Sequence, residues 1–320
     1  MKRIGVLTSG GDSPGMNACI RAVVRMSAYL EIEVYGVDRG YDGLIEGDIH
    51  EIGPRDVSDT IQRGGTILRT ARSEAFRTKD GFARAKSMLD TFKLDALVVI
   101  GGNGSMAGAC ALSEAGIKVI FLPGSIDNDL AYTDYSIGFD TAVNTALYAI
   151  SHIRDTSNAH ERVTIIEVMG RECGDIAVHA GLTGGAEIIL IPEKPVDLPV
   201  ICRTLLESRS KGKRSSIIVM AEGVDIEPQT LDDEITKRTG LDVKTVILGY
   251  IQRGGTPTAN DRLLASQLGA KAAELLSKGI SGVALGYVNG EAITEDLKEA
   301  LDKKKEGVSP LYDLANILAL

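Results

Sequence analysis

The segment LPGSIDNDL, residues 122–130, places the carboxylates of Asp127 and Asp129 on either side of an asparagine, directly after an apolar run. A carboxylate in such a position is well suited to act as a general base. Asp and Asn also start turns, because their side chains bond to the nearby backbone. The segment taken alone therefore supports a turn and a functional site equally.

Two glycine-rich loops follow other apolar runs. TSGGDSPGMN contains Gly10 and Gly11, and GGNGSMAG leads into a helical pattern at Ser105. Glycine lets a ligand approach the backbone closely, and the helix that follows offers its positive N-terminus to an anion. Two such loops favour a polyphosphate ligand. Neither matches G-x-G-x-x-G, and the chain has no G-x-x-x-x-G-K-[ST], so a standard dinucleotide or P-loop site is not supported.

The hexapeptide IQRGGT occurs twice, at residues 61–66 and 251–256. Each copy offers an arginine beside two glycines, which is suited to binding an anion. Coincidence between two Arg-Gly-Gly turns explains the repeat equally well. The repeat is therefore only a hint of anion binding.

The elements that must position these loops alternate along the chain. Short, mostly continuous apolar runs predict strands at residues 3–9, 33–38, 95–101, 118–124, 162–170, 187–193, 214–223 and 245–251. Helical patterns lie between them at residues 17–30, 79–92, 105–115, 139–156, 198–211 and 260–278. Continuous apolar runs are typical of parallel strands covered on both faces. The pattern predicts a doubly wound α/β fold, in which ligands bind beyond the carboxyl ends of the strands.

The composition sets outer limits. The 320 residues suggest two domains or one large α/β unit with a cleft, and the 36 glycines indicate many tight turns. A net charge of −9 argues against a broad surface for nucleic acid or anionic membrane, but it permits a local basic pocket. The 4 cysteines form no C-x-x-C pair, so neither a disulfide framework nor a zinc site is indicated. The start, MKRIGVLTSGGD, is neither a signal peptide nor a membrane span, so we expect a cytoplasmic protein.

As a set, these motifs resemble the bacterial ATP-dependent 6-phosphofructokinase family over essentially the whole chain. The shared stretches, in matching order, include IGVLTSGGDSPGMN, RGGTIL, TAR, GGNGS, PGSIDND, IGFDTA, IRDT, EVMGR, AEG and QRGG. The resemblance implies two Rossmann-like three-layer αβα domains of the phosphofructokinase type and a homotetramer. It assigns residues 1–138 and 252–306 to an ATP-binding domain, and residues 139–251 and 307–320 to a sugar-phosphate domain. The implied reaction is glycolytic phosphorylation of fructose 6-phosphate by MgATP.

The resemblance also implies which residues act on the nucleotide and the reacting group. Asp127 would accept the proton of the 1-hydroxyl, Ser125 would hold the reacting end, and Arg72 and Arg171 would complete the catalytic set. Mg²⁺ would be held near Asn103 and Asp129, although Asp129 is equally suited to capping its loop. The nucleotide site would be lined by Gly11, Arg72, Ser73, Gly102, Asn103, Gly104 and Ser105. Gly104 and Gly124 favour ATP, because pyrophosphate-dependent relatives carry bulkier charged residues at these positions.

Two further anion sites follow from the same resemblance. The sugar phosphate would contact Ser125, Asp127, Arg162, Met169, Gly170, Arg171, Glu222, Lys244, Tyr250 and Arg253, with Arg162 reaching into a neighbouring subunit's site. ADP or phosphoenolpyruvate would bind as an effector at Arg21, Arg25, Arg55, Asp59, Arg154, Gly185, Glu187, Lys211 and Lys213. Cations on a helix face are more often solvated, but the agreement of separated positions favours an effector site.

The chain departs from the family pattern at several of these positions. Asn103 replaces an aspartate, Lys244 an arginine and Tyr250 a histidine, while Pro54 stands where the family commonly has an arginine. These departures leave two hypotheses open. The first is an active phosphofructokinase, because Asp127 and most cationic ligands remain. The second is a weakly active paralogue that serves mainly as an effector-binding regulatory partner.

Overall fold

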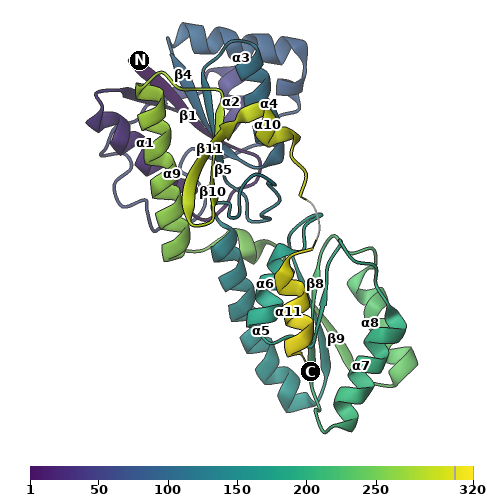
Figure 1. Ribbon diagram of the computed structural model, residues 1–320. Helices are drawn as coiled ribbons and strands as arrows, with labels where there is room; N and C mark the ends of the chain where they lie inside the picture. Colours follow the sequence, from purple (N-terminus) through teal and green to yellow (C-terminus); the bar gives the residue numbers. More distant parts are fainter. Residues whose placement is uncertain (306–307, 320) are drawn as a thin grey trace. The chain divides into compact units, whose positions relative to one another are not determined.

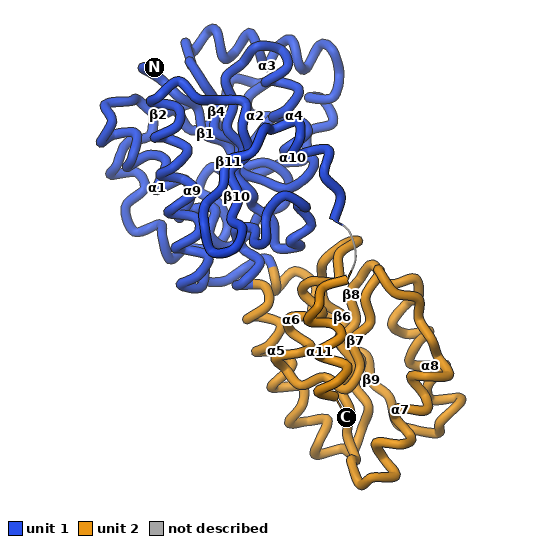
Figure 2. Tube along the Cα trace, in the orientation of Figure 1, with its two compact units in different colours: residues 1–141, 253–305 blue, residues 142–252, 306–320 orange. Residues whose placement is uncertain are grey.

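The chain folds into two compact units (Figure 2), as seen in a computed structural model that describes residues 1–305 and 308–319. Unit 1 consists of Met1–Thr141 and Arg253–Lys305, and unit 2 of Ala142–Gln252 and Glu306–Leu320. Both units are thus built from two separate stretches of the chain. The assignment of unit 1 to ATP binding and of unit 2 to sugar-phosphate binding stays a prediction.

The sheet of unit 1 has seven strands in the order β11-β10-β5-β4-β1-β2-β3. Its inner strands pair in parallel, whereas the edge strands β3 and β11 pair antiparallel to their neighbours. The strands are β1 (Arg3–Ser9), β2 (Glu33–Val37), β3 (Ile49–Glu51), β4 (Ala96–Gly101), β5 (Val119–Pro123), β10 (Val283–Val288) and β11 (Glu291–Asp296). β4 and β5 are buried at every position, which explains their continuous apolar sequence.

Helices cover both faces of this sheet (Figure 1). α1 (Met16–Tyr29) and α9 (Ala259–Ser277) pack together on one face. The other face carries α2 (Gly40–Glu46), α3 (Lys79–Thr91), α4 (Asn103–Glu114) and α10 (Leu297–Asp302). Along β1, Ile4 and Val6 join the apolar cluster with α1 and α9, while Leu7 joins the cluster with the other helices. One sheet between two apolar cores makes a three-layer unit.

Unit 2 is a smaller version of the same architecture. Its four parallel strands follow the order β7-β8-β6-β9, with β6 at Val163–Val168, β7 at Ile188–Leu190, β8 at Ser216–Ala221 and β9 at Val243–Ile247. Figure 1 shows α5, α6 and α11 on one side of this sheet and α7 and α8 on the other. These helices are α5 (Phe139–His160), α6 (Asp175–Thr183), α7 (Leu198–Ser210), α8 (Pro228–Thr239) and α11 (Pro310–Leu318).

The predicted three-layer α/β fold is confirmed, and the differences from the sequence prediction are local. The strand predicted at residues 245–251 is wrong in its second half, because β9 ends at Ile247 and Gly249, with φ 56°, starts the 3₁₀ turn Gly249–Arg253. The strands and α-helices that were not predicted are the strands β3, β10 and β11, the short helices α2, α6, α10 and α11, and the largely polar α8. In the part of the chain that the structure describes, no helix combines the length and apolar character needed to cross a membrane.

Candidate active site

Three loops that the sequence singled out meet at one edge of the unit 1 sheet. β1, β4 and β5 are adjacent and parallel, and their ends are in register, with Ser9 opposite Gly101 and Gly101 opposite Pro123. The segments that follow these strands therefore emerge side by side. They contain Gly11, the residues Gly102, Asn103, Gly104 and Ser105, and the Asp127 loop. This is the carboxyl edge, where parallel α/β sheets bind ligands.

The Asp127 loop is held by its own polar side chains. Ser125 Oγ accepts a hydrogen bond from the Asp127 N–H at 3.2 Å and donates one to Asp129 Oδ1 at 3.3 Å. Asn128, with φ 54°, accepts from the Ser136 N–H at 2.9 Å. Asp127 itself is only 2% exposed. The asparagine thus makes the turn, and the turn fixes a buried carboxylate beside the glycine loops.

Asn103 and Asp129 are joined across two of these loops. The Asn103 Nδ2 donates to Asp129 Oδ2 at 2.9 Å and to the Asp129 carbonyl at 3.3 Å. Among the described residues there is no group of three or more His, Cys, Asp or Glu side chains that could hold a metal. Mg²⁺ is usually bound through one or two carboxylates together with substrate phosphates, so the Asp129 carboxylate and the Asn103 side-chain oxygen fit that kind of site.

The glycines and serine of the second loop have different tasks. A Cβ added to Gly104 would meet no atom within 4 Å, so the space above this glycine is open. Ser105 is buried, and its Oγ donates to the Ser9 carbonyl at 2.9 Å, so this hydroxyl ties α4 to β1. The structure therefore gives Ser105 a positioning task that its motif did not reveal.

Arg72 lies in an exposed segment fastened to the first glycine loop. The Gly10 N–H donates to the Ala71 carbonyl at 3.2 Å, and Thr70 Oγ1 donates to the Gly10 carbonyl at 3.0 Å. Ser73 accepts from the Phe76 N–H at 3.1 Å. These bonds bring the Arg72 backbone to the carboxyl edge while its side chain remains accessible.

The two IQRGGT copies pack against each other within unit 1. A Cβ on Gly64 would lie 2.4 Å from the Gly255 carbonyl oxygen, and a Cβ on Gly11 would lie 2.4 Å from Arg253 Nη1. Glycine is needed at Gly64, where the close neighbour is backbone, whereas at Gly11 the close neighbour is the end of the flexible Arg253 side chain. The repeat thus has a packing reason, and it sets the Arg253 guanidinium against the first glycine loop.

A second group of predicted residues lies at the carboxyl edge of the unit 2 sheet. Met169, Gly170 and Arg171 follow β6, and Glu222 follows β8. The Arg171 N–H donates to Glu222 Oε1 at 2.9 Å, and Gln252 Oε1 accepts from the Met169 N–H at 3.2 Å. Gln252 was not singled out from sequence, although its neighbour Arg253 was.

Glu167, in β6, is a further titratable group at this edge. Burial, and then the like charges of Glu222 and Glu227, raise the pKa of Glu167 above its ordinary value. Like charges close together favour a cationic or protonated partner. The sequence offered no signal for this residue, because a glutamate inside a strand reads as an ordinary surface position.

Arg162 and Lys244 lie at the opposite, amino edge of the same sheet. Arg162 precedes β6, and Lys244 is the second residue of β9, opposite Thr164. Val163 and Val168, the two ends of β6, are about 17 Å apart, because a strand rises about 3.3 Å per residue. Arg162 and Lys244 therefore cannot contact a phosphate that Arg171 and Glu222 hold in the same unit.

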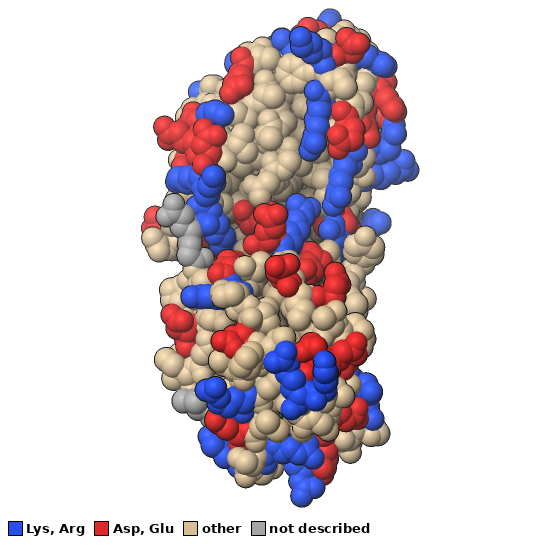
Figure 3. All heavy atoms as spheres, turned by 90° about the vertical axis from the view of Figure 1, so that its right-hand side faces the viewer, with Lys and Arg blue, Asp and Glu red and all other residues tan. Residues whose placement is uncertain are grey.

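On the face shown in Figure 3, Lys and Arg are interspersed with Asp and Glu, so the described residues of this face form no broad positive surface for anions. The structure does contain a local cluster of charges around Glu187, whose side chain is only 3% exposed. Its Oε1 lies 3.7 Å from Arg154 Nη1 and also contacts Lys213 Nζ. Arg154 Nη2 donates to the carbonyls of Gly184 and Gly185, each at 2.7 Å.

The remaining predicted effector residues lie elsewhere. Arg21 and Arg25 are on α1, and Arg55 and Asp59 are in the loop after β3, all in unit 1. Lys211 directly follows α7 in unit 2. Within unit 2, the structure brings together Arg154, Gly185, Glu187 and Lys213, while in unit 1 Val57 of the loop after β3 packs into the same apolar cluster as α1.

Comparison with known proteins gives a consistent result over the full chain. The phosphofructokinase family model matches residues 3–276. The chain is 53% identical over 319 residues to an ATP-dependent 6-phosphofructokinase of Clostridium botulinum (strain Loch Maree / Type A3), and 52% identical over 320 residues to that of Clostridioides difficile (strain 630), with 100% of each chain covered.

Solved structures agree with the fold. Phosphofructokinase from Saccharomyces cerevisiae superimposes with a TM-score of 0.88 at 34% identity, covering 100% of this chain and 48% of that one. The pyrophosphate-dependent phosphofructokinase from Marinobacter aquaeolei gives a TM-score of 0.86 at 21% identity, covering 99% and 91%, which bears on the fold alone.

Proposed function

This chain belongs to the phosphofructokinase family, and on that premise we propose that it is an ATP-dependent 6-phosphofructokinase of glycolysis. It transfers the γ-phosphoryl group of ATP to the 1-hydroxyl of fructose 6-phosphate. The observation that carries this proposal is a buried carboxylate, Asp127, fixed among the glycine loops of a chain that matches enzymes of this name over its whole length. The relatives described above are named as enzymes, so the regulatory-paralogue alternative has no support from them.

Asp127 acts as the general base in this proposal. Its carboxylate accepts the 1-hydroxyl proton as the oxygen attacks the γ-phosphorus, and ADP leaves from the opposite side. Phosphoryl transfer requires in-line positioning more than covalent chemistry. The Ser125 hydroxyl, which orders the loop through Asp127 and Asp129, keeps the carboxylate in one place during the step.

Charge on the transferring group is neutralised by cations at the same edge. Arg72, accessible beside the first glycine loop, is placed to contact the γ-phosphate. Bound Mg²⁺ would supply further neutralisation of the phosphate oxygens. Asp129 and the side-chain oxygen of Asn103 would hold it, and Gly11, Ser73 and Gly102 would line the rest of the nucleotide site.

ATP is the favoured phosphoryl donor over pyrophosphate because glycine, which has no side chain, occupies positions 104 and 124. A Cβ on Gly104 would enter open space, whereas one on Gly124 would lie 3.0 Å from Ile100 and 3.1 Å from Met16. A larger residue at Gly104 would fill the room that a nucleotide needs, and one at Gly124 would disturb the strand end.

In this proposal the sugar phosphate is held by residues of unit 2 together with Arg253, which belongs to unit 1. Met169, Gly170, Arg171 and Glu222 bind the sugar end, with Tyr250 and Arg253 completing the pocket. Arg162 precedes β6, a strand about 17 Å long, and Lys244, opposite Thr164, lies about 13 Å from the level of Val168. This separation supports the proposal that both residues contact the ligand of a second subunit. The proposed assembly is a homotetramer.

The Glu187 cluster is the proposed effector site for ADP or phosphoenolpyruvate. Its buried carboxylate places the cations Arg154 and Lys213 side by side, which suits a phosphate group. Arg21, Arg25, Arg55, Asp59 and Lys211 complete the predicted set. Pro54, in place of a common arginine, leaves one cation fewer in this site.

The proposal is tested by a coupled assay of phosphoryl transfer to fructose 6-phosphate with ATP, GTP or pyrophosphate as donor. We expect ADP release that depends on fructose 6-phosphate and on Mg²⁺, with little transfer from pyrophosphate. Absence of transfer at saturating ATP and sugar phosphate would overturn the proposed activity. A preference for pyrophosphate would overturn the donor assignment alone.

A further inference from the structure

A carboxylate that the sequence analysis did not consider lies between the two proposed phosphate ligands of unit 2. β6 and β9 pair in parallel with Val163 opposite Val243, and the Val163 N–H donates to the Asp242 carbonyl at 3.0 Å. Arg162 and Asp242 therefore stand at equivalent positions, one residue before each strand. Their closeness follows from strand register, not from sequence distance.

Asp242 contacts both cations, one with each carboxylate oxygen. Its Oδ2 lies 2.9 Å from Arg162 Nε, and its Oδ1 lies 3.2 Å from Lys244 Nζ. The side chains of Arg162, Asp242 and Lys244 are 31%, 51% and 57% exposed, although the Arg162 Nε atom that faces Asp242 is itself buried. The contact with Lys244, followed by that with Arg162, holds the pKa of Asp242 below its ordinary value against a smaller opposing effect of burial.

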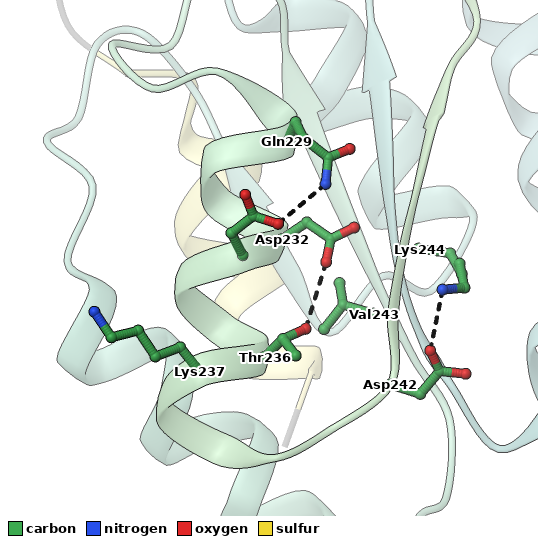
Figure 4. A pocket seen from close by; sticks show the side chains of 8 residues that line it. Gln229, Asp232, Thr236, Lys237, Asp242, Val243 and Lys244 are labelled. Carbon is green, nitrogen blue, oxygen red and sulfur yellow. Dashed lines mark hydrogen bonds and ion pairs between the residues drawn. The ribbon is translucent and has the colours of Figure 1, made fainter.

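Asp242 borders a cavity whose described lining contains one cation besides Lys244, namely Lys237. Figure 4 shows Asp242 and Lys244 at one side of a cavity of about 420 Å³ between α8 and β9. Figure 4 shows Asp232 and Lys237 on α8, across from β9, and Asp233 of the same helix also lines the cavity. In the described lining the three carboxylates outnumber the two ammonium groups, and one of these ammonium groups, that of Lys244, is already in contact with Asp242.

We propose that Asp242 is an affinity- and specificity-determining residue, an internal counter-ion that a phosphate must displace from Arg162 and Lys244. This inference rests on the proposed function, because it takes these cations as ligands of the sugar phosphate. A doubly charged phosphate monoester can replace a singly charged carboxylate at both cations. A singly charged anion gains little from the exchange, so Asp242 selects for phosphate dianions by competition.

The test is direct binding of fructose 6-phosphate and of inorganic phosphate to the full chain, by titration calorimetry, in wild type, Asp242→Asn and Asp242→Ser. Exposed ion pairs contribute modestly, so we expect Kd for both ligands to fall about three- to tenfold in both variants. In steady-state assays KM for fructose 6-phosphate should fall while kcat stays unchanged. Acetate, a singly charged competitor, should weaken sugar-phosphate binding more in the variants than in wild type.

Asp233→Asn is the matched control, because it removes the same charge from the other wall of the same cavity. Its Kd values should stay within about twofold of wild type, since it contacts neither cation. The Asp242→Asn effect should vanish in an Arg162→Ala, Lys244→Ala background.

Several results would overturn the inference. An unchanged Kd would show that Asp242 does not compete, and a raised Kd would show that it orders the cations for binding. An equal fall of Kd in Asp233→Asn would show that the effect comes from the summed negative charge of the cavity and not from the contacts of Asp242. Failure of the proposed function would be seen separately, as absence of phosphoryl transfer by the wild-type protein. Calorimetric titration with inorganic phosphate would still test whether Asp242 competes for Arg162 and Lys244.

Discussion

At the scale of single residues, the most informative contact is the bond from Asn103 to Asp129. The neutral amide of Asn103 donates a hydrogen bond of 2.9 Å to the Asp129 carboxylate, which also accepts a hydrogen bond from the Ser125 hydroxyl. With aspartate at position 103, two carboxylates would face each other at this distance and repel until a cation entered. Asn103 therefore stabilises the loop without metal, but it contributes a weaker metal ligand.

Asn103→Asp should lower the Mg²⁺ concentration needed for half-maximal activity and make thermal stability depend on Mg²⁺. We expect a lower Tm than wild type in chelator and recovery when Mg²⁺ is added. Calorimetric Mg²⁺ titration in the presence of ADP, together with thermal unfolding, measures both effects. An unchanged Mg²⁺ requirement would mean that position 103 does not contact the metal.

Sequence motifs located the Asp127 loop correctly but not the tasks of all its neighbours. The turn interpretation of LPGSIDNDL is confirmed, because Asn128 makes the turn that holds Asp127, while the functional interpretation stays a prediction. The Ser105 hydroxyl bonds to Ser9, a partner 96 residues away. Such a bond depends on strand order, which no local pattern contains.

At the scale of elements, Asp261 joins the starts of two helices. It lies in the first turn of α9 and accepts from the N–H groups of Gly138 and Thr141, each at 2.8 Å, at the start of α5. Burial raises the pKa of Asp261 to about 6, although these hydrogen bonds and the Thr141 hydroxyl act in the opposite direction. The first turn of α5 is thereby fixed within unit 1.

Asp261→Asn should change the pH dependence of stability. The folded pKa of about 6 exceeds the unfolded value of 3.8, so between these values the folded state binds more protons than the unfolded state. The contribution of this group to the free energy of unfolding therefore falls by about 3 kcal/mol as pH rises through this window. The variant should lose that dependence.

Denaturant unfolding at pH 4.5 and pH 7 measures this difference. The variant should also be less stable than wild type at pH 4.5, because an amide NH₂ would face a backbone donor. Asp90→Asn, at an exposed position on α3, is the control and should leave the pH dependence unchanged. Equal pH slopes in wild type and Asp261→Asn would refute the raised pKa.

Element prediction was close for the strands that are buried at every position. β4 and β5 are buried at every position, and their apolar runs predicted them closely. α8 has only Pro228, Leu231 and Ile235 buried, so its sequence carries little periodic signal. Asp242 escaped notice for a related reason, because its ion pairs arise from the pairing of β6 with β9.

At the scale of the whole molecule, residues that we propose to contact the sugar phosphate lie at both edges of the unit 2 sheet. Arg171 and Glu222 follow the strands, while Arg162 and Lys244 lie at the strand starts. One phosphate cannot use both groups within a subunit, because the strand between them is about 17 Å long. The proposed homotetramer would resolve this separation through sites shared between subunits.

Mixing Arg162→Ala subunits with Asp127→Asn subunits should restore part of the activity that each variant lacks. Some sites in a hybrid assembly would then combine an intact Asp127 with an intact Arg162 from another subunit. Native mass spectrometry establishes that hybrids form, and the coupled assay measures recovery. No recovery in verified hybrids would show that each site uses Asp127 and Arg162 of the same subunit.

The central claim is that Asp127 is the base for phosphoryl transfer from ATP to fructose 6-phosphate, and Asp127→Asn tests it most directly. The substitution keeps the side-chain size but removes the proton acceptor, so fructose 1,6-bisphosphate formation should fall by about 10²- to 10⁴-fold. ATP binding and Tm should stay close to those of wild type, and Asp90→Asn should keep full activity. Near-normal turnover of purified Asp127→Asn would contradict the account.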